Sequence, residues 1–106
     1  MISRQTIDEI STKIAERFQP EKIILFGSYA RGEATENSDI DLLVITETDL
    51  PKPKRSAPMY SLLRDYHVSK DILVYTPEEA EQYRDLPAAV VRRAFREGIV
   101  LYERQA

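Results

Sequence analysis

The sequence of 106 residues is 42% hydrophobic and 31% charged, proportions that are typical of a soluble globular protein. It contains no cysteine and one histidine, which excludes a disulfide framework and argues against a zinc site built from thiolates or imidazoles. A bound metal would therefore need oxygen ligands, which favours magnesium or manganese. The net charge of −3 argues against a broad surface for nucleic acid, so we expect no direct nucleic-acid binding.

Length and hydropathy also bound the organisation of the chain. A chain of 106 residues has room for one hydrophobic core, so we expect a single domain over residues 1–106. The N-terminal stretch MISRQTIDEI lacks the apolar segment of a signal peptide, and no apolar run is long enough to cross a bilayer. We therefore expect a cytoplasmic protein that makes no membrane contact.

The first half of the chain is predicted to form a helix, a strand, a short helix and a second strand. Ile7, Ile10, Ile14 and Phe18 recur at steps of three and four residues, which predicts a helix over 4–18. The β-branched runs KIILFG and DIDLLVIT predict strands. SYARGEA after the first run predicts about two helical turns with its serine as N-cap. The two strands cover residues 22–27 and 39–46, and the short helix between them covers residues 28–34.

The middle of the chain begins with a break in the hydrophobic pattern. ETDLPKPKRSAP (47–58) contains three prolines and the basic cluster KPKR, and is predicted to be a solvated loop. A helix is predicted over 59–67 and a strand over 71–76. Thr76 is expected to cap a further helix that begins with Pro77.

The C-terminal segment is predicted to be a helix over 86–97 that ends at Gly98. IVLYE (99–103) follows as a last strand or an extended tail. Three arginines are expected in the last turns of this helix, where cations interact favourably with the helix dipole. They are Arg92, Arg93 and Arg96. The expected buried stripe consists of Leu86, Val90, Ala94 and Phe95.

A Gly-Ser pair, an Asp-x-Asp pair and a later aspartate mark one edge of the predicted sheet. If Gly27-Ser28 and the two aspartates, Asp39 and Asp41, form one site, the end of the first strand lies beside the start of the second, and these strands are antiparallel. The helical segment after the second strand then allows a parallel third strand that begins at Asp71. The sequence therefore predicts a mixed sheet in an α/β fold with all these residues at one edge.

The residue types at this edge suit phosphate chemistry. Asp39 and Asp41 point to the same face of a strand, and two carboxylates so close together favour a divalent cation between them. Asp71 can supply a third carboxylate, and two metal ions can clamp the oxygens of a phosphoryl or nucleotidyl transfer. Gly27 allows the backbone to approach a phosphate, and Ser28 adds a hydroxyl at a helix start.

The stretch GSYARGEATENSDIDLLV resembles the signature of the nucleotidyltransferase superfamily that includes DNA polymerase beta. The short chain, including its tail RRAFREGIVLYE, more narrowly resembles the minimal nucleotidyltransferase family, whose members pair with HEPN proteins as toxin–antitoxin systems. The resemblance implies an α/β (α+β) polymerase-beta-like fold with helices packed on a small mixed sheet. It also implies that Asp39 and Asp41 bind magnesium.

The same resemblance implies roles for the remaining candidate residues and for the molecules they bind. Asp71 would be the third carboxylate, as a metal ligand or a base. Gly27 and Ser28 would hold the triphosphate of ATP, and Arg31 would assist at its phosphates. Two magnesium ions and ATP would be the cofactor and the nucleotide donor.

The function implied by the resemblance is that of an antitoxin which AMPylates its partner. The enzyme would move AMP from ATP to a hydroxyl, that of a tyrosine, on a HEPN-type toxin with which it forms a hetero-oligomer. Two alternatives stay open on the sequence. One is a non-catalytic binding protein that neutralises its partner by covering it, and the other is a nucleotidyltransferase for small molecules of the aminoglycoside type.

Overall fold

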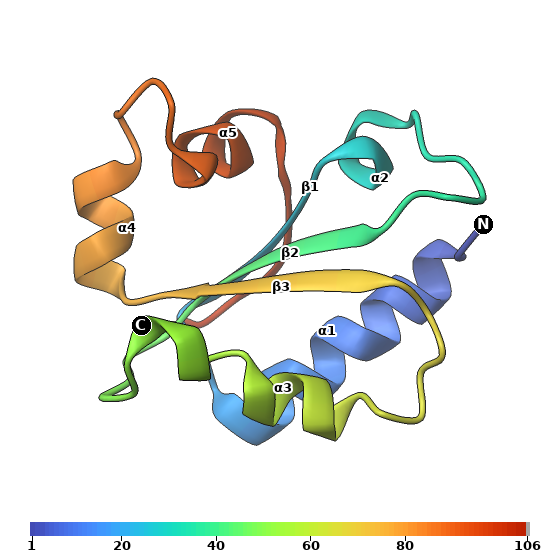
Figure 1. Cartoon of the computed structure of the whole chain (residues 1–106), viewed down its shortest axis with the longest axis horizontal. Helices are drawn as coiled ribbons and strands as arrows, with labels where there is room; N and C mark the ends of the chain where they lie inside the picture. The colour runs from blue at the N-terminus through green and yellow to red at the C-terminus, as the bar shows by residue number, and fades with distance from the viewer. Residues whose placement is uncertain (106) are drawn as a thin grey trace.

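Helices cover both faces of a four-stranded sheet in the computed structural model, which describes residues 1–105 (Figure 1). The longest helix, α1, has 15 residues, and no helix in this range is long and apolar enough to cross a membrane. The helices are α1 (Arg4–Phe18), α2 (Ser28–Arg31), α3 (Ala57–Leu62), α4 (Pro77–Tyr83), α5 (Val90–Glu97) and the 3-10 helix η1 (Lys52–Lys54). The strands are β1 (Lys22–Phe26), β2 (Ile40–Ile45), β3 (Lys70–Tyr75) and β4 (Ile99–Glu103).

The sheet is mixed, and its strand order is β3-β2-β1-β4. β1 is antiparallel to both β2 and β4, whereas β2 and β3 are parallel. This arrangement confirms the expected fold class and the predicted direction of the first three strands. It also shows that residues 99–103 form a strand rather than an extended tail. The ends of β1, β2 and β3 that bear the glycine and aspartates therefore meet at one edge of the sheet.

Two hydrophobic cores lie on opposite faces of the sheet. On one face, α1 and α3 pack against alternate strand residues, and the predicted stripe of Ile7, Ile10 and Ile14 is buried there. On the other face, α4 and α5 contribute Ala80 and Val91 to a second buried cluster. Each isoleucine buried in this way contributes about 2 kcal/mol relative to an exposed one. The alternation of strand residues between the two cores determines which face each aspartate joins.

Three predicted helices are shorter than expected, and one of them, α3, covers Ala57–Leu62 instead of residues 59–67. α2 is a single turn whose N-cap is Gly27, and Ser28 is its first residue and makes no capping hydrogen bond. α5 begins at Val90 instead of residue 86, because the chain makes a tight turn from Leu86 to an extended Ala89 before the helix starts. Leu86 is 48% exposed, so its predicted place in the buried stripe is wrong.

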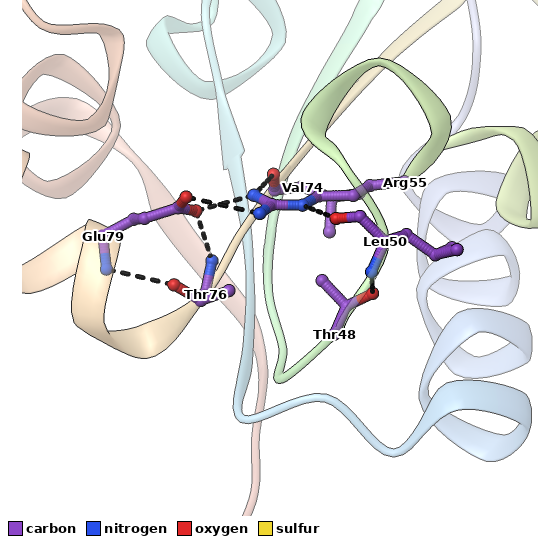
Figure 2. A network of polar contacts seen from close by, with 6 residues as sticks. All are labelled: Thr48, Leu50, Arg55, Val74, Thr76 and Glu79. Carbon is purple, nitrogen blue, oxygen red and sulfur yellow. Dashed lines mark hydrogen bonds and ion pairs between the residues drawn. The ribbon is translucent and has the colours of Figure 1, made fainter.

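The segment predicted to be a solvated loop is anchored by an arginine. Figure 2 shows that the Arg55 guanidinium donates to both carboxylate oxygens of Glu79, at 2.6 and 3.3 Å, and to the carbonyl of Leu50 at 2.9 Å. Glu79 also accepts from the Thr76 amide at 2.9 Å and completes the capping box that starts α4. The Arg55 side chain is only 10% exposed. We call this arrangement the Arg55–Glu79 clamp; it corrects the prediction of a fully solvated KPKR cluster.

Candidate active site

The strand register brings the glycine and two of the aspartates together. Asp41 of β2 lies opposite Phe26 of antiparallel β1 and opposite Asp71 of parallel β3. Adjacent strands are about 4.8 Å apart, and residues paired across a ladder point to the same face. Asp41 and Asp71 therefore lie side by side, next to the turn in which Gly27 follows Phe26. In Figure 1 this edge lies beside α2, where β1 ends and β2 and β3 begin.

Gly27 is required at this edge for two separate reasons. Its φ of +76° lies in the left-handed region, which residues with a side chain rarely adopt. A Cβ built at residue 27 would also collide with Oδ2 of Asp41. The backbone of the β1–α2 turn is thus in contact with the Asp41 carboxylate, as the pairing of glycine and aspartate in the sequence predicted.

Asp39 joins the same face, and its carboxylate accepts a hydrogen bond from the loop before β3. Asp39 is exposed and precedes β2 by one residue, so it shares the face of Asp41. Its Oδ1 accepts a hydrogen bond from the hydroxyl of Ser69, the residue just before β3. We call Gly27, Asp39, Asp41 and Asp71 together the carboxylate edge.

The electrostatics of the carboxylate edge are repulsive. Burial raises the pKa of Asp41, and the negative charges of Asp71 and then Asp39 raise it further. Arg93 and Arg31 act in the opposite direction, but the net shift is upward. Among the ion pairs of residues 1–105, none involves these three aspartates. The site is therefore an accumulation of negative charge that no basic side chain of residues 1–105 pairs with directly.

The donor set of the carboxylate edge suits a hard divalent cation in its chemistry, because magnesium prefers carboxylate oxygens. The arrangement of the side chains is looser than a ligand shell. Within the described residues 1–105, no group of three or more His, Cys, Asp or Glu side chains is gathered closely enough to hold a metal ion. One oxygen of the three carboxylates, Oδ1 of Asp39, is engaged by the Ser69 hydroxyl.

The two residues predicted to contact phosphates beside Gly27 both lie in α2. Ser28 is half-buried at the first position of the helix. Arg31 donates from Nε to Glu33 at 2.8 Å and from Nη1 to Glu97 of α5 at 3.0 Å. The Arg31 guanidinium therefore links α2 to α5 in this structure instead of standing free beside the carboxylates.

The arginines of α5 are the residues near the site that sequence reasoning missed. Arg92 and Arg93 lie in the first half of α5, so the predicted interaction with the C-terminal end of the helix dipole applies to Arg96 alone. The Arg93 guanidinium lies 5.7 Å from the centre of the Phe26 ring. Its positive charge lowers the pKa of Asp41 and so opposes the upward shift. Three arginines within five residues of an acidic chain were the available signal.

Known proteins with similar sequences include protein adenylyltransferases. A protein of Methanocaldococcus jannaschii named "Putative protein adenylyltransferase MJ1305" is 48% identical over 61 residues, which are 56% of this chain and 40% of that one. The protein adenylyltransferase MntA of Thermococcus cleftensis is 46% identical over 48 residues, or 42% of this chain and 48% of that one. The chain thus spans about half the length of the curated relatives it matches.

Solved structures and a family model agree on the fold. A crystal structure of a toxin–antitoxin with AMP-PNP superposes with a TM-score of 0.64 at 24% identity, over 92% of this chain and 74% of that chain. This likeness establishes the fold, which is that of the nucleotidyltransferases. Residues 7–105 match the family model described as nucleotidyltransferase domain. The family expected from the Gly-Ser and Asp-x-Asp signature is thereby confirmed, and the chain belongs to the nucleotidyltransferase domain family.

Proposed function

We propose that this chain is a magnesium-dependent nucleotidyltransferase that transfers AMP from ATP to a hydroxyl of a HEPN-type toxin, and so acts as its antitoxin. The observation that supports the proposal most strongly is the strand register, in which Asp41 lies opposite both Phe26 and Asp71. This register puts two carboxylates beside a turn that has no side chain at Gly27. A phosphate group and its metal ions need this combination of open backbone and oxygen ligands.

The proposed reaction assigns a role to each residue of the carboxylate edge. Two magnesium ions held by Asp39, Asp41 and Asp71 would neutralise the phosphates and lower the pKa of the attacking hydroxyl. Gly27 and Ser28 bind the triphosphate. The acceptor oxygen attacks the α-phosphorus, the bond to the bridging oxygen of the β-phosphate breaks, and pyrophosphate leaves. Asp71 accepts the proton of the hydroxyl on its carboxylate.

The partner and the acceptor are inferred from the relatives. MntA of Thermococcus cleftensis is named as a protein adenylyltransferase, and the structural relative with AMP-PNP is a toxin–antitoxin. Both support a protein acceptor rather than a small molecule. We infer that the acceptor hydroxyl belongs to a tyrosine of the toxin and that ATP is the donor.

A second candidate function is a non-catalytic antitoxin that neutralises its partner by binding. The observation that favours it is the separation of the three carboxylates, which do not form a metal-ligand group within residues 1–105. In that case the nucleotide site would be vestigial or regulatory.

The two candidates are separated by a labelling experiment. The chain is incubated with labelled ATP, magnesium and the product of the adjacent gene, and label on that partner is measured together with its toxicity. Asp39→Asn and Asp41→Asn are expected to reduce labelling at least 100-fold, whereas Asp65→Asn, which changes an exposed aspartate after α3, leaves it unchanged. Neutralisation without label in the wild-type chain and in both site variants would exclude the transferase and favour the binding protein.

A further inference from the structure

A cleft of about 470 Å³ runs along α5, whose Arg93 lies over the ring of Phe26. The proposed function does not use it. Its lining consists of Pro87, Arg92, Arg93, Arg96 and Glu97. We call it the arginine cleft. Its volume is in the range of small-molecule sites and is large enough for a phosphate chain.

The charge of the arginine cleft is unbalanced. Within residues 1–105, Arg92 and Arg96 form no ion pair, and Arg93 reaches Glu97 only at 3.9 Å. Glu97 is shared with Arg31, to which it is closer at 3.0 Å. Three guanidinium groups thus face one carboxylate that is already engaged, although the chain as a whole has a net charge of −3.

The position of Arg92 adds to this imbalance. It lies in the first turn of α5, where the helix dipole is unfavourable for a cation. Its side chain is half-buried and makes no hydrogen bond to another side chain among residues 1–105. The fold therefore gains no evident stability from this arginine, which favours a role in binding an anion.

The arginine cleft is connected to the carboxylate edge through two contacts. Arg93 lies over the ring of Phe26, the residue that pairs with Asp41 in the sheet. Oε1 of Glu97 joins Arg93 to Arg31 of α2, the helix that starts at Gly27. A ligand whose one end lies at the Gly27 turn would therefore meet guanidinium groups along α5 at its other end.

We propose that the arginine cleft binds a polyphosphate, namely the β- and γ-phosphates of the nucleotide, which rests on the proposed function for the identity of the nucleotide. Guanidinium groups donate pairs of parallel hydrogen bonds to phosphate oxygens and stay charged at every relevant pH. The cleft would extend the triphosphate site that begins at Gly27 and Ser28, and would hold the β- and γ-phosphates while the reacting α-phosphate lies at the carboxylate edge. It would also retain pyrophosphate after the transfer.

The first test uses inorganic tripolyphosphate as the ligand and requires neither metal nor partner. Binding to the full chain is measured by calorimetry in the presence of EDTA. Arg92→Gln/Arg96→Gln is expected to weaken binding at least tenfold. The matched control is Arg17→Gln/Arg64→Gln, which removes the same charge from a cleft of about 380 Å³ beside α1 and α3 and is expected to leave binding unchanged.

Two further measurements control for misfolding of the double variant and identify the source of the bound phosphate. The single variant Arg96→Gln changes an exposed residue and is expected to weaken tripolyphosphate binding several-fold with an unchanged melting temperature. With magnesium present, the double variant should weaken binding of a non-hydrolysable ATP analogue tenfold but leave AMP unaffected, because AMP lacks the β- and γ-phosphates. If the cleft binds only free pyrophosphate, the double variant will weaken binding of tripolyphosphate but not of the ATP analogue. This result would overturn the assignment to the nucleotide.

These outcomes are distinct from failure of the proposed function. Suppose that the partner is not labelled, but the arginine variants lose binding of both tripolyphosphate and the ATP analogue. The transferase function is then excluded, and the cleft remains a nucleotide-binding site. Equal binding by the double variant and by the Arg17/Arg64 control overturns the arginine cleft, whether or not label is transferred.

Discussion

Carboxylates are treated in opposite ways at the two ends of β3. At its start, Asp71 and Asp41 lie side by side without an ion pair, and burial and mutual repulsion raise the pKa of Asp41. Beyond the other end of β3, both carboxylate oxygens of Glu79 accept hydrogen bonds from the Arg55 guanidinium. These hydrogen bonds lower the pKa of Glu79 from 4.5 to about 2. The Arg55–Glu79 clamp carries its own cation and stabilises the fold. The carboxylate edge lacks one, so its negative charge is available to a cation from solution.

The largest expected effect is that of breaking the carboxylate edge with Asp41→Asn. We expect transfer to fall at least 100-fold, while the free energy of unfolding stays the same or rises by up to about 1 kcal/mol, because the neutral amide relieves repulsion. Transfer is followed with labelled ATP and stability by urea denaturation. A loss of stability beyond about 1 kcal/mol would show that the Asp41 carboxylate stabilises the fold. It would contradict the difference drawn between the carboxylate edge and the Arg55–Glu79 clamp.

Breaking the Arg55–Glu79 clamp should have the opposite effect on stability. Arg55→Ala leaves Glu79 without its cation and removes the donor to the Leu50 carbonyl, so we expect a loss of about 3 kcal/mol in urea denaturation. The control is Arg4→Ala, whose ion pair with Asp8 is about half exposed, and it should cost less than about 0.5 kcal/mol. Equal losses in the two variants would mean that the clamp is an ordinary surface ion pair.

The pH dependence of stability sharpens the same comparison. The Arg55 hydrogen bonds, followed by the Thr76 amide, hold the folded-state pKa of Glu79 at about 2. Its contribution is therefore complete above about pH 4.5 and is lost as pH falls toward 2. We expect Glu79→Gln to remove about 2 kcal/mol of the stability that the wild-type chain loses between pH 5 and pH 2. Urea titrations across this range test it; parallel wild-type and variant curves would refute the assignment.

The smallest expected effect concerns the cap within the clamp. Thr76→Ala removes the hydroxyl that accepts from the Glu79 amide and should cost about 1 kcal/mol, whereas Thr76→Ser should retain most of it. Thermal unfolding of the three chains measures the difference. If serine is no better than alanine, the side chain of residue 76 acts through its methyl group and the capping box is not the stabilising feature.

Much of the fold and the core of the candidate site follow from local patterns. The isoleucine spacing of α1, the β-branched strands and the Thr76-Pro77 cap each depend on neighbours within a few residues, and all were predicted correctly. The antiparallel pairing of β1 with β2 followed from requiring Gly27-Ser28 and the two aspartates to form one site, and the observed strand direction confirms it.

The features that sequence reasoning missed depend on distant contacts. Arg55 and Glu79 are 24 residues apart, and nothing in the KPKR cluster indicates that one cation is buried against α4. The start of α5 depends on the turn from Leu86 to Ala89, which shortens the helix by about one turn at its N-terminal end. The later start leaves Arg92 in the first turn of a short helix, and the approach of Arg93 to Phe26 depends on how α5 packs on the sheet, which no local pattern indicates.

The loop between Gly32 and Ser38 has a consequence for engineering. Its side chains are largely exposed, and its hydrogen bonds, such as those between Thr35 and Ser38, stay within the loop or reach only the adjacent turn. The pairing of β1 with β2, rather than the length of this loop, holds Gly27 against Asp41. We therefore expect this loop to tolerate insertion of a peptide tag or a longer segment, while the two strands keep their register.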